Sequence, residues 1–185
     1  GISMMPSELR TYDGITHFLT QRFDRNGNEK IHTQTLAAMS PTSDSYEDIF
    51  AVIRRLNLPY EDSKQQYLRM IFNVIARNVD DHSKNFSFCM NRTGTWQLSP
   101  AYDLTYSVDP TAPPYSNRHS LTVNGKNEDI TYEDFETIAL NNDIQDYKAL
   151  IDSVSNAIAN FEDYAKELDI NEKLIESIKS DFIEV

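Results

Sequence analysis

The sequence predicts an α+β fold with a helical majority, and three observations support this prediction. Candidate strands lie in the first two thirds of the chain, whereas residues 131–185 have only helical periodicity. The chain has 185 residues, the length of a single domain. Hydrophobic residues make up 39% and charged residues 25%, a composition typical of an ordinary globular protein. Strands that come first and helices that follow favour the α+β class.

Two β-hairpins are predicted. The candidate strands of the first, Leu9–Tyr12 and Ile15–Phe23, are separated by an Asp-Gly pair, which favours a tight turn. The second consists of Phe86–Met90 and Trp96–Ser99, around a turn at residues 91–95.

Helical signals begin near Thr33 in the first half of the chain. Ser45 and Asp48 form a capping box for a helix that continues to about Leu56. The most hydrophobic helix covers residues 60–78. Because its apolar side chains extend around most of its surface, we expect it to lie at the centre of the fold.

The second half of the chain begins with a loop and continues as helices. Residues 104–130 are predicted to be an ordered loop with one candidate short strand near Leu121–Val123. Thr131 and Asp134 form a second capping box. Two apolar stripes follow at helical spacing: Tyr147, Leu150, Ile151, Val154, Ile158, Phe161 and Ala165, then Leu174, Ile175 and Ile178.

The composition excludes several classes of protein. No run of 18 apolar residues is present, so no membrane-spanning helix is expected, and no secretory signal is visible. The single cysteine, Cys89, has no partner for a disulfide or a zinc site, which favours a cytoplasmic location. The five glycines are isolated from one another, so the chain contains no glycine-rich phosphate-binding loop.

Charge is unevenly distributed along the chain, whose formal net charge is −12. Residues 1–126 carry 13 acidic and 13 basic side chains, whereas residues 127–185 carry 16 acidic and 4 basic ones. Because an acidic surface repels the phosphate backbone, direct non-specific DNA binding is disfavoured. The acidic part is either a solvated helical face or a docking surface for a basic partner.

The segment Asn78–Asn85 is the strongest functional signal. It places Asp, His, Lys and Asn side chains between the hydrophobic helix and the second hairpin, where a rigid scaffold would hold them. If the hairpin turn is centred between residues 92 and 93, Asn85 lies opposite roughly residue 100. Asp103 would then be on the order of 10 Å or less from Asn85. We therefore expect Asp80, Asn85 and Asp103 to converge on one site.

This set of side chains indicates phosphotransfer chemistry. Two carboxylates and an amide oxygen are hard ligands that suit Mg²⁺ when it also holds phosphate oxygens. An Asp five residues before an Asn, followed by a hairpin and another Asp, is the pattern of protein kinases. Two other interpretations are a solvated polar loop and a zinc or phosphohydrolase site. The second would need clustered histidines, whereas His17, His32 and His119 are scattered.

Three motifs together resemble the HipA family, which consists of bacterial toxin kinases of type II toxin–antitoxin systems. The motifs are Arg22–Arg25, Asp-x-His-x-Lys-Asn-Phe within Asn78–Phe86, and Leu98–Leu104, in the order and spacing of the family. The resemblance continues through Val123–Lys126 into the helical tail. It covers nearly the whole chain, but only the carboxy-terminal portion of the family.

The resemblance implies a protein-kinase-like C-lobe with a short amino-terminal hairpin and a catalytic-loop hairpin. The whole chain, residues 1–185, would form this lobe. Residues 1–28 would be the hairpin and hinge, and residues 29–126 the helical core with the catalytic and metal-binding loops. Residues 127–185 would be an acidic helical tail.

The resemblance also implies a role for each matching residue. Asp80 corresponds to the catalytic base that takes the proton of a substrate hydroxyl, and Lys84 to the residue nearest the transferred phosphoryl group. Asn85 and Asp103 correspond to the Mg²⁺ ligands. The residues implied to contact ATP, either at the hinge or at the phosphates, are Gln21, Phe23, Asp81, His82 and Tyr102.

Complete members of the family phosphorylate a protein hydroxyl, and they bind a small helix-turn-helix antitoxin that tethers them to operator DNA. In this chain no lysine precedes Gln21, and the glycine-rich loop is absent. Loss of one preorganised donor costs about 10²–10³ in rate, so the isolated chain is expected to be inactive. The chain is then a fragment, half of a split protein or a decayed member, and activity needs an amino-terminal lobe in cis or in trans.

A second hypothesis is a non-catalytic module, derived from a kinase lobe, that binds an antitoxin or another protein. The missing lysine and glycine-rich loop favour this hypothesis, whereas the intact Asp80, Asn85 and Asp103 oppose it.

Overall fold

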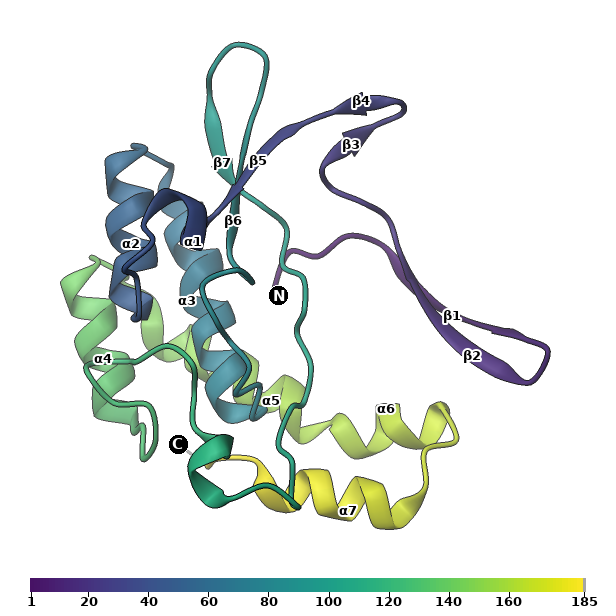
Figure 1. Ribbon diagram of the computed structural model, residues 1–185. Helices are drawn as coiled ribbons and strands as arrows, with labels where there is room; N and C mark the ends of the chain where they lie inside the picture. Colours follow the sequence, from purple (N-terminus) through teal and green to yellow (C-terminus); the bar gives the residue numbers. More distant parts are fainter. Residues whose placement is uncertain (185) are drawn as a thin grey trace.

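The computed structural model describes residues 1–184, apart from the side chain of Pro114. Its helices hold more residues than its strands, and its sheets are small and antiparallel, which confirms the α+β prediction (Figure 1). In the described part of the chain, no helix is long and apolar enough to cross a bilayer.

The strands form three separate sheets within residues 1–184. Strand β1 pairs with β2, β3 pairs with β4, and β6 lies between β5 and β7. The strands are β1 (Ser7–Tyr12), β2 (Ile15–Thr20), β3 (Arg25–Asn26), β4 (Glu29–Lys30), β5 (His32–Thr35), β6 (Ser87–Met90) and β7 (Trp96–Leu98).

The helices form one group, and the third sheet extends from its end near α1 and α2 (Figure 1). They are α1 (Leu36–Met39), α2 (Tyr46–Arg55), α3 (Tyr60–Ile75), α4 (Tyr132–Asn141), α5 (Tyr147–Ala159), α6 (Phe161–Glu167) and α7 (Glu172–Asp181), with a short 3₁₀ helix at Pro114–Asn117.

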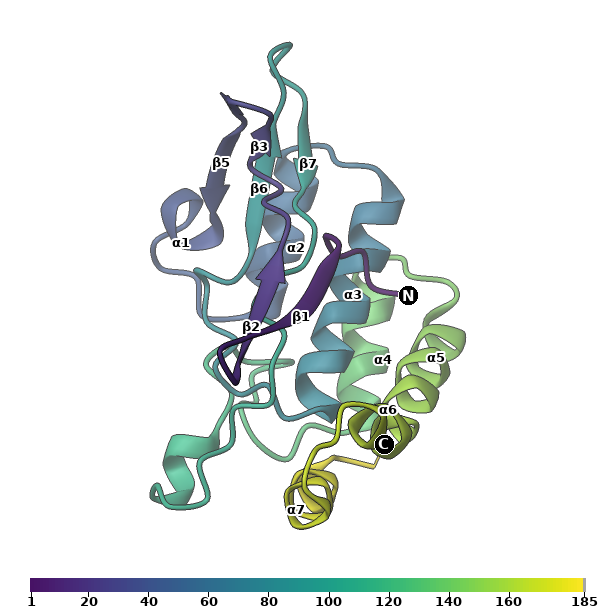
Figure 2. The same ribbon diagram turned by 90° about the vertical axis from the view of Figure 1, so that its right-hand side faces the viewer.

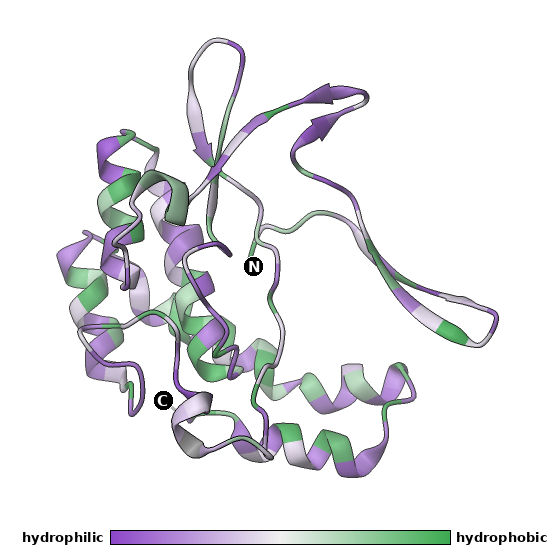
Figure 3. Cartoon of the chain, in the orientation of Figure 1, coloured by the Kyte–Doolittle hydropathy of each residue, from purple (hydrophilic) through white to green (hydrophobic). Residues whose placement is uncertain are grey.

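Helix α3 is the centre of the hydrophobic core, as its composition predicts. Nine of its 16 residues are buried. Helices α2 and α5 pack against it, and Figures 1 and 2 show it running through the middle of the helical part. Figure 3 shows hydrophobic residues gathered along α3, α4 and α5. Because α3 is anchored on several sides, the loop that follows it begins from a fixed point.

Both predicted capping boxes are present. The Ser45 hydroxyl accepts the backbone N–H of Asp48, and the Asp48 carboxylate accepts the N–H of Ser45. Thr131 and Asp134 form the same reciprocal pair at the start of α4. These bonds satisfy backbone donors that the first helical turn leaves unpaired.

Three local predictions were wrong. The segment that follows Thr33 is a strand, because residues 32–35 pair with β6, and helix α1 begins only at Leu36. The apolar stripe that starts at Tyr147 belongs to two helices, separated at Asn160. The segment near Leu121–Val123 makes only isolated bridges rather than a strand.

The β1–β2 hairpin projects away from the helical part of the protein (Figure 1). Its register places Leu9 opposite Phe18 and Tyr12 opposite Ile15. All four side chains are exposed, by 50% to 73%. Since adjacent residues of a strand point to opposite faces, apolar side chains lie on both faces of this hairpin. Large hydrophobic residues arranged in this way indicate a surface that another polypeptide covers.

A matched pair of leucine variants tests the position of the core. Leu36→Ala removes a fully buried side chain and is expected to lower the free energy of unfolding by about 2–5 kcal/mol. Leu140→Ala changes a side chain that is 65% exposed, and the free energy is expected to change by less than about 0.5 kcal/mol. Urea denaturation followed by circular dichroism measures both. Equal losses for the two variants would contradict this assignment of the core.

Candidate active site

The loop between α3 and β6 carries the predicted catalytic residues. Helix α3 ends at Ile75, and Arg77 has a φ of 58°, which turns the chain away from the helix axis. The backbone N–H of Asn78 donates to the Asn73 carbonyl at 2.9 Å. The Asn78 side chain donates to Asn73 Oδ1 and to the carbonyl oxygen of Asp103, both at 3.0 Å. Asn78 therefore joins the end of α3, the catalytic loop and the Asp103 segment.

Asp80 lies at the exposed side of this loop, and its side chain is 66% exposed. Its backbone is held: the N–H donates to Ser107 Oγ at 3.1 Å, and the carbonyl accepts from Asn85 Nδ2 at 3.0 Å. His82 Nε2 is 3.9 Å from Asp80 Oδ1. Asn85 makes this hydrogen bond through its amide nitrogen, so its Oδ1 is not used in it. The Asp80 carboxylate is thus open to solvent on a backbone that is held through both its N–H and its carbonyl.

The second hairpin returns the chain to this loop. Phe88 lies opposite Leu98, so the turn is centred on Thr93 rather than between residues 92 and 93, and the register differs by one residue from the predicted one. Asp103 follows with a φ of 57°, which a residue other than glycine seldom adopts. Aspartate adopts this conformation more readily than most residues, and Asp13, Asp129, Asp143 and Asp169 share it. Here the bond from Asn78 to the Asp103 carbonyl holds the segment.

Tyr102 forms a second connection between the two loops. Its hydroxyl donates to the Lys84 carbonyl at 2.7 Å and lies 2.5 Å from Ser87 Oγ. Burial raises the pKa of Tyr102, so the hydroxyl keeps its proton. The Tyr102 ring stacks on Phe23 with ring centroids 5.4 Å apart. A cleft of about 310 Å³, lined by Tyr102, Asp103 and the β1–β2 hairpin, lies at this point.

The predicted hinge is held by charged side chains. Arg22 donates to Asp24 at 2.8 and 2.6 Å, and Arg25 donates to the same carboxylate at 2.6 Å. The hydrogen bond from Arg22 holds the pKa of Asp24 at about 2. The backbone N–H of Gln21 donates to the Pro6 carbonyl at 3.0 Å. These contacts fix the path of the chain where β2 leads into β3.

The remaining predicted site residues differ in burial. Lys84 is exposed, and His82 is partly buried. Asp81 is fully buried, and its carboxylate points into the protein rather than toward the cleft. The structure therefore joins Asp80 to Asn85 directly, links their loop to the Asp103 carbonyl through Asn78, and places the Asp81 side chain on the inner side of the same loop.

Sequence reasoning missed several supporting residues, and one pattern could have revealed them. Gln66, Arg69 and Asn73 are buried polar residues spaced three and four apart along α3, so they share one helix face. Arg69 donates to the Ser99 carbonyl at 2.6 Å. Burial lowers the pKa of Arg69 to about 10, so it stays charged at neutral pH. Arg69 and Asn73 find their partners in the surrounding segments, as buried polar side chains in an apolar helix require, whereas the Gln66 side chain has no hydrogen-bond partner among the described residues.

Ser107 was also missed, and no sequence pattern marks it. Its hydroxyl oxygen accepts the backbone N–H of Val79 at 2.8 Å and that of Asp80 at 3.1 Å. It lies in a loop without periodicity, about 27 residues away from its partners. Only the folded chain brings it to the catalytic loop.

The donor set fits Mg²⁺ better than zinc. Asn85 and Asp103 offer amide and carboxylate oxygens, and Mg²⁺ commonly takes one or two such ligands and completes its shell with water and phosphate oxygens. Within residues 1–184, no group of three or more His, Cys, Asp or Glu side chains is arranged to hold a metal ion. The zinc interpretation needs such a group and gains no support.

Comparison with known proteins identifies relatives. The family described as "HipA-like C-terminal domain" matches residues 1–161. A protein of Sinorhizobium fredii (strain NBRC 101917 / NGR234), named "Putative kinase Y4mE", is 27% identical over 124 residues, which are 58% of this chain and 29% of that protein.

A solved structure has the same fold. It is the complex of the Shewanella oneidensis MR-1 toxin–antitoxin system HipA, HipB and its operator DNA. The match has a TM-score of 0.71 at 15% sequence identity, and it covers 96% of this chain and 49% of the other. The chain thus spans half or less of the length of these two relatives. Because the family match extends over most of its residues, this protein belongs to the family of HipA-like C-terminal domains.

Proposed function

We propose that this domain is the carboxy-terminal lobe of a serine/threonine protein kinase toxin, which transfers the γ-phosphoryl group of ATP to a protein hydroxyl. The observation that carries the proposal is the arrangement around Asp80. Its exposed carboxylate lies on a loop that Asn85, Ser107 and Asn78 hold, and Asn78 also binds the Asp103 segment. Phosphotransfer of this kind depends mainly on positioning and electrostatics.

Each residue has a defined task in the proposed reaction. Asp80 accepts the proton of the substrate hydroxyl as the hydroxyl oxygen bonds to the γ-phosphorus of ATP. The bond between the γ-phosphorus and the β,γ-bridging oxygen breaks, and ADP leaves. Lys84 is exposed beside the loop and faces the negative charge of the transferred group. Mg²⁺ held by Asn85 and Asp103 would neutralise phosphate charge. Gln21, Phe23 and Tyr102 are proposed to contact the nucleotide, with His82 at its phosphate end.

The projecting hairpin supports the proposal that a second lobe completes the protein. Strands β1 and β2 pair only with each other in the described part of the chain, so each has a free edge. Both of their faces carry exposed apolar side chains. The relatives are about twice as long as this chain or longer. An amino-terminal lobe that carries the glycine-rich loop and the lysine would extend this sheet and cover it.

Partner and location are part of the same proposal. The Shewanella structure contains HipB and operator DNA, which supports a helix-turn-helix antitoxin as partner and indirect contact with DNA. The acidic residues of 127–185 suit a basic partner protein. A buried Cys89 without a disulfide agrees with a reducing cytoplasm.

The second candidate function is a non-catalytic binding module. The same exposed β1–β2 hairpin supports it, because its apolar side chains could bind a partner protein without catalysis.

The isolated chain is expected to bind ATP·Mg²⁺ only weakly and to show no measurable phosphotransfer. The reason is that no glycine-rich loop or strand lysine is present to hold the phosphates. Isothermal titration calorimetry measures the affinity, and transfer of label from γ-labelled ATP measures the activity. A sub-micromolar dissociation constant would contradict this expectation.

The hairpin is expected to be the docking site of the missing lobe. The double variant Leu9→Ser with Phe18→Ser should leave the unfolding midpoint of the isolated chain unchanged, because both side chains are at least half exposed. It should weaken binding of an added amino-terminal lobe by at least tenfold, since about 0.8 kcal/mol is lost for each buried CH₂. Calorimetry with the separate lobe measures this. Leu140→Ser, at an equally exposed site on α4, is the control and should bind normally.

Addition of the amino-terminal lobe, as a fusion or as a separate chain, is expected to restore phosphotransfer that depends on Asp80 and Asp103. Asp80→Gln removes the base, and Asp103→Asn removes one negative charge from the metal site. Each should lower the rate by about 10²–10⁴-fold, and the two losses need not add because the groups act together. Radiolabel transfer to a protein substrate is the assay.

The control for these variants is Asp152→Asn, which changes an exposed acidic residue on α5 and should keep the full rate. If the completed protein stays inactive, or if both site variants transfer label as fast as the parent, the binding-module function is correct instead.

A further inference from the structure

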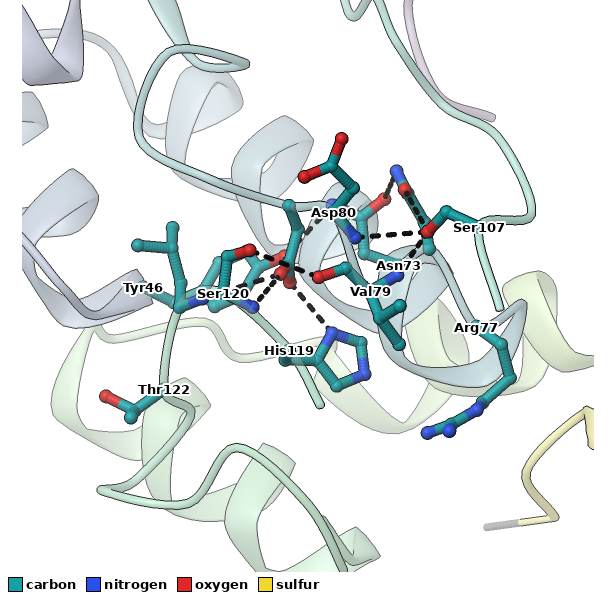
Figure 4. A network of polar contacts seen from close by, with 12 residues as sticks. Tyr46, Asn73, Arg77, Val79, Asp80, Ser107, His119, Ser120 and Thr122 are labelled. Atoms are coloured by element: carbon teal, nitrogen blue, oxygen red, sulfur yellow. Dashed lines mark hydrogen bonds and ion pairs between the residues drawn. The ribbon is translucent and has the colours of Figure 1, made fainter. Parts of the chain in front are cut away.

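Two adjacent aspartates of the catalytic loop point in opposite directions. The Asp80 side chain is 66% exposed, whereas the Asp81 side chain is completely buried. Figure 4 shows the Asp80 carboxylate pointing away from the network of polar contacts beneath it. A buried carboxylate without partners would be very unfavourable, so the contacts of Asp81 decide how this pair is held.

The Asp81 carboxylate is saturated with donors from other segments. Its Oδ2 accepts the Tyr46 hydroxyl at 2.6 Å and lies 2.9 Å from His119 Nδ1. Its Oδ1 accepts the backbone N–H of Ser120 at 2.7 Å and, at a longer 3.4 Å, that of Leu121. One side chain thus binds helix α2 and residues 119–121 to the catalytic loop.

Tyr46 gives this contact a rigid support. It is fully buried at the start of α2, and its hydroxyl accepts Asn73 Nδ2 of α3 at 2.9 Å. Burial and the charge of Asp81 raise the pKa of Tyr46 well above its ordinary value, so its hydroxyl keeps the proton that it donates. The carboxylate is therefore anchored to two core helices through one tyrosine.

His119 completes the anchor. Its side chain is fully buried. Because an ionised carboxylate can only accept, His119 Nδ1 carries the hydrogen. Its Nε2 is buried and has no hydrogen-bond partner among the described residues. The geometry therefore places the hydrogen of His119 on Nδ1, because an N–H at Nε2 would have no acceptor among the described residues.

The backbone on the other side of Asp80 is held as well. Ser120 donates from both its N–H and its hydroxyl to the Val79 carbonyl, at 3.1 and 3.2 Å. Ser107 accepts the N–H groups of Val79 and Asp80 (Figure 4). Residues on both sides of Asp80 are thus fixed, and Asp81 is the one that binds through a buried charge.

We propose that Asp81 is a positioning residue, whose buried carboxylate fixes the direction of the Asp80 side chain by tying the catalytic loop to Tyr46 and to His119 and Ser120. This inference rests on the proposed function, in which Asp80 is the base. It assigns Asp81 a structural contact with the protein interior in place of a contact with the nucleotide.

Asp81→Asn tests the proposal, because it keeps the size of the side chain but replaces one accepting oxygen with an NH₂ group that only donates. In the isolated chain, we expect the ¹⁵N signals of His119 to show loss of the Nδ1–H form and the Asp80 carboxyl ¹³C signal to broaden. In the completed kinase, we expect kcat to fall by at least about tenfold, while KM for ATP changes by less than about threefold.

Asp134→Asn is the matched control. Asp134 is also buried and accepts from Asn124, Lys126 and Thr131, but it caps α4 away from the site. This variant should lose stability while the Asp80 signal and kcat stay unchanged. If Asp81→Asn does not fold, Tyr46→Phe takes its place and should lower kcat at least about threefold.

The proposal is overturned if the folded Asp81→Asn variant keeps the parental kcat and the parental Asp80 signal. It is also overturned if Tyr46→Phe, used because Asp81→Asn does not fold, leaves kcat unchanged. The same holds if Asp134→Asn lowers kcat as much as Asp81→Asn does. If the completed parent protein transfers no phosphate, the proposed function fails. In that case the NMR signals of Asp80 and His119 in the isolated chain still show whether Asp81 positions the Asp80 side chain.

Discussion

Helix α3 must bury a polar stripe together with its apolar surface, and the arrangement of the site follows from that requirement. An unsatisfied buried polar group costs about 1–3 kcal/mol, and Arg69 and Asn73 find partners in neighbouring segments, whereas the Gln66 side chain has none among the described residues. Arg69 donates a hydrogen bond to the carbonyl of Ser99, at the start of the segment that leads to Asp103. Asn73 donates a hydrogen bond to the Tyr46 hydroxyl and accepts one from the side chain of Asn78. The residues that bind the polar side chains of α3 therefore include Asn78, near the start of the Asp80 loop, and Ser99, before the Asp103 segment.

The two loops are consequently held by side chains that donate hydrogen bonds to backbone carbonyls, and two of these donors, Asn85 and Tyr102, are themselves candidate site residues. The Asp103 carbonyl, the Asp80 carbonyl and the Lys84 carbonyl all accept hydrogen bonds from neighbouring side chains. The Asp80 carboxylate stays open to solvent. This arrangement explains how the loop can be held and still present a free acceptor: the backbone around Asp80 and the Asp81 carboxylate make the structural hydrogen bonds, and the Asp80 carboxylate keeps its lone pairs.

Features with a short-range cause could be predicted from the sequence. The capping boxes at Ser45 and Thr131 depend on residues three positions apart, and both are present. The central position of α3 follows from its composition. In contrast, residues 32–35 form a strand because they pair with β6, more than 50 residues later. A local helical signal could not anticipate that pairing.

The candidate site also has features that the sequence could predict and features that depend on distant contacts. The spacing of Asp80, Asn85 and Asp103 indicated a shared site, and contacts through Asn78 and Asn85 bring their backbones together. The spacing to Asn85 selected Asp80 as the candidate base, but the sequence could not show that Asp81 is buried. Their difference arises from Tyr46 and His119, which lie 35 and 38 residues from Asp81. The fold therefore decides which aspartate stays open to solvent, by burying the other one under hydrogen bonds from distant segments.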